Sequence, residues 1–125
     1  EVLSAISLEG KILIDVTNAN LPEFVLAESG SKTSSEVVAQ WARGAKVVKA
    51  FNTLYAQVLA ENPKVGDGNR VIFYSGNNDD AKDVVSGIIN RIGFAGVDLG
   101  SLNEGGKLQR FPGGSLSTLN LIKLK

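Results

Sequence analysis

Polar side chains follow four apolar runs of this 125-residue sequence. The runs end at Thr17-Asn18, Phe51-Asn52-Thr53, Gly76-Asn77-Asn78 and Asp98-Leu99-Gly100. In open parallel sheets, ligands bind beyond the carboxyl ends of the strands. Three of these ends carry amides or hydroxyls, which can bond a carboxamide or a ribose without adding charge. The alternative is that the same residues cap helices and turn the chain, and it is favoured for Asn77-Asn78, which precede a strong helical pattern.

Two charged residues lie inside apolar runs, at Asp15 and Lys49. A charge inside a buried strand is costly unless it is paired, so each should have a partner or face a cleft. Asp15 could instead be a site carboxylate or accept hydrogen bonds from the backbone. If the two strands are neighbours, we expect Asp15 and Lys49 to form a pair, and a separation beyond about 6 Å would contradict this.

The composition excludes several kinds of chemistry. The sequence has no cysteine and no histidine, which rules out disulfides, thiol nucleophiles, a Ser-His-Asp triad and histidine-ligated zinc. Thirteen basic residues balance thirteen acidic ones, and neither sign forms a long run, so nothing favours nucleic acid or an anionic membrane as a partner. No apolar run approaches the length of a membrane span. We also see no signal peptide and expect a cytoplasmic location.

Strand patterns alternate with helix patterns along the chain, which predicts an α/β fold with a mostly parallel sheet and flanking helices. The expected strands are residues 11–18, 46–51, 70–75 and 94–99. Thr33 and Glu36 form a predicted capping box for a helix that ends at Gly44. The clearest helix follows Asn78 and ends at Gly93. Its apolar positions recur at helical spacing: Ala81, Val84, Val85, Ile88, Ile89 and Ile92.

Two further helices are expected. One spans residues 54–60, capped by Asn52 or Thr53. The other is a final helix that opens at residues 112–115 and carries Leu116, Leu119 and Ile122. The start of this final helix could hold an anion, although an ordinary helix start is the better interpretation. The chain is treated as one unit, residues 1–125, with residues 1–60 as its first part and 61–125 as a strand-helix extension.

The phosphate-binding pattern G-x-G-x-x-G between a strand and a helix is absent. Gly66-Asp-Gly68 contains a single G-x-G, but it precedes a strand and is interpreted as a loop. Because the glycine pattern is absent, the chain lacks a recognisable cradle for a pyrophosphate. No acidic residue is placed to bond a ribose either.

Four segments together resemble a known family. They are residues 10–18 (GKILIDVTN), 46–53 (KVVKAFNT), 71–76 (VIFYSG) and 93–102 (GFAGVDLGSL). In this order and spacing they resemble the NADP oxidoreductases of the deazaflavin-coenzyme-dependent family. They are also similar to the cytosolic reductase domains of six-transmembrane metalloreductases. The resemblance covers nearly the whole chain, and residues 47–53 are its most specific part.

The resemblance implies the rear part of a Rossmann-type NAD(P)-binding fold. It implies that Thr17, Asn18, Ala50, Phe51, Asn52 and Thr53 line the cleft near the nicotinamide of NADP. It implies that Gly100, Ser101 and Leu102 lie toward a partner flavin or deazaflavin. The expected chemistry is direct hydride transfer between two flat rings, which asks the protein for positioning and polarity and needs no catalytic side chain.

Members of that family begin with a βαβ unit that carries the glycine loop, and this chain has none. We therefore expect a C-terminal portion of such an enzyme, inactive by itself, that associates with the missing N-terminal segment or forms a homodimer through unpaired edges. The alternative is a non-catalytic interaction or regulatory module that retains the sheet without the cofactor loop. A third interpretation, a flavodoxin-like domain, needs a phosphate-holding loop after the first strand, where residues 17–22 supply no glycine.

Overall fold

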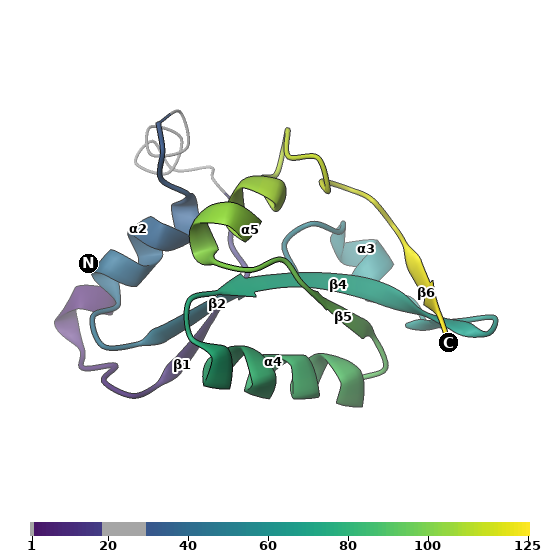
Figure 1. Ribbon diagram of the computed structural model, residues 1–125, viewed down its shortest axis with the longest axis horizontal. Helices are drawn as coiled ribbons and strands as arrows, with labels where there is room; N and C mark the ends of the chain where they lie inside the picture. The colour runs from purple at the N-terminus through teal and green to yellow at the C-terminus, as the bar shows by residue number, and fades with distance from the viewer. Residues whose placement is uncertain (1, 19–29) are drawn as a thin grey trace.

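The computed structural model describes residues 2–18 and 30–125. Their elements alternate between strands and helices, which confirms the α/β class with flanking helices (Figure 1). The expected loop around Pro22 lies outside the described residues. In chain order the elements are η1 (Leu3–Ala5), β1 (Ile12–Asp15), α2 (Ser34–Trp41), β2 (Lys46–Ala50), α3 (Ala56–Leu59), β3 (Lys64–Val65), β4 (Gly68–Gly76), α4 (Asp79–Arg91), β5 (Ala95–Asp98), α5 (Leu102–Leu108) and β6 (Ile122–Leu124).

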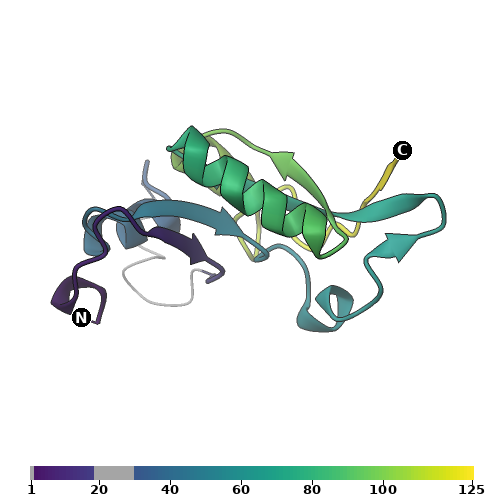
Figure 2. The ribbon, with the colours of Figure 1, turned by 90° about the horizontal axis from the view of Figure 1, so that it is seen from below.

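The sheet is mixed, and β4 is its long central strand. β1 pairs with β2 in parallel, with Asp15 opposite Lys49. β2 pairs with β4 antiparallel, and β4 pairs with β5 in parallel. The early part of β4 also pairs antiparallel with β3 and β6 at one end of the molecule (Figure 2). Because β4 and β5 run opposite to β1 and β2, the carboxyl ends of the two pairs lie at opposite edges of the sheet.

Local signals position most of the helices as the sequence predicts. Thr33 and Glu36 form the expected capping box of α2. Asn78 caps α4 by accepting from the Ala81 N–H at 2.9 Å. The turn at Gly66-Asp67 joins β3 to β4, which confirms the loop interpretation. The prediction that Asn52 or Thr53 caps the next helix is wrong: α3 begins later, after Tyr55, and has no side-chain cap.

The C-terminal region departs most from the predictions. The expected final helix is absent, because Ile122–Leu124 pairs as β6 with the start of β4. Residues 112–115 accordingly open no helix. A helix forms instead at Leu102–Leu108, where Ser101 accepts from the Glu104 N–H at 3.0 Å as its cap. Ser101 and Glu104 have capping-box spacing, but the adjacent pair Gly105-Gly106 disfavours a helix interior and masked that signal.

Helices cover both faces of the sheet (Figure 1). α4 packs against one face through Val85 and Ile89, which meet Val48, Ile72 and Tyr74 from the strands. α2 and α5 cover the other face, where Val38 and Leu102 meet Val47. Two residues of the predicted apolar face of α4, Val84 and Ile92, are exposed. Among the described helices, none is long and apolar enough to cross a membrane.

Candidate functional site

Asp15 and Lys49 meet at the carboxyl ends of β1 and β2. Their charged atoms lie 3.8 Å apart, and both side chains are 2% exposed, which confirms the predicted pair. Adjacent parallel strands place the two residues side by side, pointing to the α2 face. The Ser35 hydroxyl donates to Asp15 Oδ2 at 2.6 Å. Lys49 Nζ donates to the Thr17 carbonyl at 2.9 Å and to Ser34 Oγ at 3.4 Å.

This buried pair organises the end of β1. Asp15 Oδ1 accepts from both the backbone N–H and the hydroxyl of Thr17, at 2.9 and 2.6 Å. Thr17 is therefore tied to both partners, by its carbonyl to Lys49 and by its donors to Asp15. Since buried ions need hydrogen bonds as well as a countercharge, the pair and the two serines of α2 fix the path of the chain into Asn18.

Asn52 is the most unusual polar residue at this edge. It is 2% exposed. Its Nδ2 donates to Asn18 Oδ1 at 3.0 Å and to the Gln109 carbonyl at 2.7 Å. Its Oδ1 is buried, and no hydrogen-bond partner for it exists among the described residues. An unsatisfied buried acceptor costs about 1–3 kcal/mol, and less than 1 Å² of Oδ1 is accessible to solvent.

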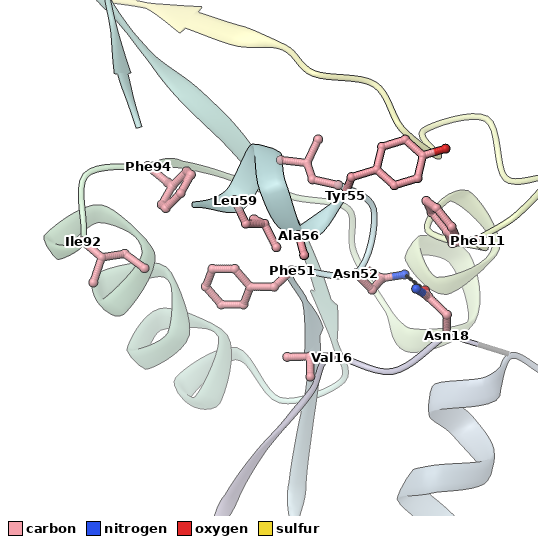
Figure 3. A pocket seen from close by; sticks show the side chains of 11 residues that line it. Val16, Asn18, Phe51, Asn52, Tyr55, Ala56, Leu59, Ile92, Phe94 and Phe111 are labelled. Atoms are coloured by element: carbon pink, nitrogen blue, oxygen red, sulfur yellow. Dashed lines mark hydrogen bonds between the residues drawn. The ribbon is translucent and has the colours of Figure 1, made fainter. Parts of the chain in front are cut away.

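A cavity of about 630 Å³ opens beside Asn52, and Figure 3 shows the side chains that line it. This volume lies in the ordinary range for small-molecule sites. Phe51 points into the middle of the cavity, while Asn18 and Asn52 face each other near Phe111 at one side. Most of the lining is apolar or aromatic: Val16, Asn18, Phe51, Asn52, Leu54, Tyr55, Ala56, Leu59, Ile92, Phe94 and Phe111. The cavity therefore offers mostly apolar walls, with the contact between Asn18 and Asn52 at one side.

The backbone turns sharply where β2 enters the cavity. Phe51 has a positive φ of 68°, which is costly for a residue with a bulky side chain. Ala50 before it is fully buried in the core. Thr53 after it is also buried, and its carbonyl accepts from the Thr118 N–H at 2.8 Å. The turn thus directs Phe51 into the cavity, while Ala50 before it and Thr53 two residues later are buried in the protein.

The structure brings together six of the residues expected at the site and separates the other three. Thr17, Asn18, Ala50, Phe51, Asn52 and Thr53 all lie at the carboxyl ends of β1 and β2. Gly100, Ser101 and Leu102 follow β5 at the opposite edge. There the Gly100 carbonyl accepts from the Gly76 N–H, and Asn77 Oδ1 accepts from the Leu102 N–H. A small pocket at that edge is lined by Asn77, Asn78 and Leu102 together with the start of β2.

Sequence reasoning missed Gln109, which is fully buried just after α5. Its Nε2 donates to the Lys49 and Phe73 carbonyls at 3.2 and 3.3 Å, and its Oε1 accepts from Ser75. It therefore joins α5 to β2 and β4 and supplies the carbonyl that holds Asn52. No local pattern marks such a residue. Tyr55 and Phe111, whose rings meet edge to face with centroids 5.8 Å apart, were also missed.

The donor set fits an uncharged planar ligand and gives no support for a metal. Within residues 2–18 and 30–125, no three acidic side chains gather as metal ligands. The side chains of Asp15 and Lys49 contact each other away from the cavity, and among the described residues none that lines the cavity is charged. The apolar and aromatic walls suit an uncharged planar ring. The part of this chain that we describe offers no comparable place for a pyrophosphate.

Comparison with known proteins supports the assignment of an α/β fold. No family model matches the chain. Metalloreductase STEAP3 of Rattus norvegicus is 34% identical over 105 residues, which are 84% of this chain and 20% of that protein. The chain thus spans about a fifth of the length of the curated relatives it matches.

Two solved structures are also similar. A hypothetical protein of Sinorhizobium meliloti is 45% identical with a TM-score of 0.87, over 98% of this chain and 60% of that one. A putative F420-dependent NADP-reductase of Arthrobacter sp. FB24 is 26% identical with a TM-score of 0.64, over 82% of this chain and 48% of that one. These similarities confirm the resemblance to NADP oxidoreductases, and the chain has the Rossmann-like fold of these proteins.

Proposed function

We propose that this chain forms the rear part and one cleft wall of an NADP(H)-dependent oxidoreductase. The observation that carries the proposal is the aromatic cavity beside Asn52, at the carboxyl ends of β1 and β2. Ligands of α/β sheets bind beyond such strand ends. Similarity to a metalloreductase and to an NADP-reductase structure supports the same cofactor class.

The proposed task of the protein is to position a ring and exclude water. NADPH, when bound, supplies the hydride, and the reacting atoms belong to the cofactor. Phe51, Tyr55 and Phe111 would hold a planar ring between apolar surfaces. Asn18 and Asn52 would orient its amide group at the rim. Such positioning is what direct hydride transfer asks of a protein.

A flavin or deazaflavin is the proposed hydride acceptor. Its support is that the Arthrobacter protein is named as an F420-dependent reductase and that the cavity is lined by aromatic residues. The contact of Gly100, Ser101 and Leu102 with this acceptor stays a prediction, since these residues lie at the other edge of the sheet. A cytoplasmic location, a homodimer and the division at residue 60 also stay predictions.

The glycine loop that would bind the pyrophosphate is not among the residues of this chain. The proposal assigns that task to a part of the full-length protein outside residues 1–125. The test therefore uses the full-length protein that carries this chain. NADPH binding is measured by titration calorimetry, and NADPH oxidation is followed by absorbance with FMN or a deazaflavin as acceptor.

A cavity-filling variant and a matched control sharpen this test. Ala56 is exposed and lines the cavity, whereas Ala60 is exposed just after the same helix and does not line it. Ala56→Trp should lower the rate of NADPH oxidation by about tenfold or more, because a displaced ring loses its aligned geometry. Ala60→Trp should leave the rate near the wild-type value. Absence of NADPH binding by the full-length protein would contradict the proposed function.

A further inference from the structure

One wall of the cavity contacts the core through partly buried residues only. Residues 55–59, which we call the wall, comprise α3 and the residue before it, and three of them line the cavity. α3 is a single turn with no buried residue and no side-chain cap, and its Val58 and Leu59 are only partly buried against the core. α4, by contrast, buries Val85 and Ile89 fully. Because an isolated helical turn is unstable in water, the wall depends on contacts outside its own turn.

The C-terminal segment supplies such contacts. Residues 110–121, which we call the strap, run from α5 to β6 past α3 (Figure 1). The strap starts after Gln109, which is fully buried. It ends at Leu121, whose carbonyl accepts from the Val71 N–H of β4 at 2.8 Å. Both ends of the strap are therefore fixed on the central part of the fold.

Two contacts of the strap hold the start of the wall. The Thr118 N–H donates to the Thr53 carbonyl at 2.8 Å, two residues before the wall. The ring of Phe111 meets that of Tyr55 edge to face, with 5.8 Å between the ring centroids. Figure 3 shows these two rings together at one side of the cavity. The strap thus holds the chain where it leaves β2 and enters α3.

Arg70 connects the far end of the wall to the strap. Its side chain is 7% exposed. One end of the guanidinium, Nη1, donates to Asn120 Oδ1 of the strap. The other end, Nη2, contacts Glu61 Oε2 at 3.3 Å and donates to the Asn62 carbonyl at 3.4 Å, just after α3. Hydrogen bonds from a charged group are stronger than neutral ones, so this buried guanidinium ties the strap to the chain that follows the wall.

We infer that the strap holds the wall in place, with Phe111 and Asn120 as positioning residues, and that wall and strap open together while the sheet stays folded. The contacts lie before the wall at Thr53, within it at Tyr55 and after it at Glu61. Because the wall lines the cavity, its opening opens the cavity. The inference goes beyond the proposed function, since it concerns access to the cavity and does not depend on which ligand the cavity takes.

Hydrogen exchange followed by mass spectrometry tests this inference in the full-length protein without ligand. The amide N–H groups of residues 58–60 donate to the carbonyls of Tyr55 and Ala56 within the turn of α3, so their exchange reports its opening. Phe111→Ala removes the ring contact and should speed this exchange by about three- to tenfold, as expected for an edge-to-face pair. Phe111→Tyr keeps the ring and should stay near the wild-type rate. Exchange in α4 should be unchanged in both variants.

Asn120→Ala tests the contact at the other end of the wall. It removes the strap acceptor for Arg70 and should speed exchange at residues 58–60. The amides of residues 117–119, which are hydrogen-bonded in the strap, should speed up with them. Asn103→Ala is the matched control, because this asparagine on α5 also bonds other elements through its side chain but makes its contacts with Ser31 and Glu36. It should leave residues 58–60 unchanged.

Urea titration of each variant separates local opening from a general loss of stability. Faster exchange in the wall and the strap, with α4 unchanged, is the expected result. Equal acceleration in α3 and α4 would show global destabilisation and overturns the inference. Unchanged exchange at residues 58–60 in either Phe111→Ala or Asn120→Ala also overturns it, as does acceleration confined to the wall or to the strap. Absence of NADPH binding overturns the proposed function alone, because the exchange is measured without ligand.

Discussion

The two edges of the sheet each hold a lysine–aspartate contact, and the two contacts differ in burial. At the ends of β1 and β2, Lys49 and Asp15 are both 2% exposed in their side chains. At the ends of β4 and β5, Lys82 contacts Asp98 at 3.2 Å and Asp79 at 3.7 Å, and these carboxylates are 44% and 95% exposed. The residue types match, but the environments do not.

The difference in burial indicates a different structural role for each edge. Water solvates both carboxylates, and Lys82, whose side chain is 10% exposed, keeps one of them when the other is removed. The Asp15–Lys49 pair has no such relief, and it depends on Ser34, Ser35 and Thr17 for its remaining hydrogen bonds. The buried edge is thus held rigidly, and it is the edge that borders the aromatic cavity. Rigid support of this kind is what a positioning site needs.

The largest expected effect comes from breaking the buried pair. Lys49→Met leaves Asp15 buried without its countercharge and should lower the free energy of unfolding by about 3–5 kcal/mol. Urea titration of wild type and variant measures the loss. Adding Asp15→Asn to Lys49→Met should recover part of it, because the stranded charge is gone. A loss of unfolding free energy as small as that from breaking a surface ion pair would contradict the difference between the two edges.

A smaller effect is expected at Glu36, whose carboxylate joins α2 to α5 by accepting from Asn103 at 2.8 Å. Burial raises the pKa of this carboxyl. Hydrogen bonds from Asn103 on α5 and from the Thr33 N–H and hydroxyl, together with the charge of Lys107, lower the pKa by more than burial raises it. The pKa of Glu36 therefore lies below its ordinary value. Because the pKa of Glu36 is lower in the folded state than in the unfolded state, the ionised carboxylate stabilises the fold at pH values above the unfolded-state pKa. This stabilisation is lost as the pH falls through the folded-state pKa.

Glu36→Gln keeps the capping-box geometry and removes only the charge. At about pH 7 it should cost about 0.3–1 kcal/mol, the usual range for a carboxylate in the first turn of a helix. The difference from wild type should shrink as the pH falls through the folded-state pKa of Glu36, because the carboxyl becomes protonated. Urea titrations at neutral and at acidic pH measure it. A difference that persists at low pH would show that packing, not charge, joins α2 to α5.

The smallest effect is expected at the exposed edge. Asp98→Asn removes the charge that faces Lys82 but keeps an oxygen for the Gly100 N–H, which Asp98 Oδ1 accepts at 2.8 Å. The variant should lose less than about 1 kcal/mol. Thermal unfolding at low and high salt checks this, since salt should screen the remaining difference. A salt-independent loss as large as that of Lys49→Met would remove the contrast between the edges.

Local sequence signals determined much of this protein. The caps at Thr33 and Asn78 fix the starts of α2 and α4 by hydrogen bonds within three residues, and such bonds can be predicted from spacing alone. The Asp15–Lys49 pair was predictable for a related reason: two charges inside apolar strands must be neutralised, and each offers the other a partner. Polar residues after β1 and β2 similarly marked Asn18 and Asn52 as candidates.

The tertiary structure alone decided where these pieces meet. The direction of β4 depends on pairing with β2, β3 and β6 at once, and it is this direction that sends Gly100, Ser101 and Leu102 to the far edge. Ile122–Leu124 became a strand because the early part of β4 offered it unpaired backbone, not because of its own pattern. Gln109 and the free Oδ1 of Asn52 arise from contacts more than thirty residues apart in the chain, which no local spacing encodes. The sequence alone specified the caps and the charges, and packing of distant segments decided which polar atom would be left without a partner beside the cavity.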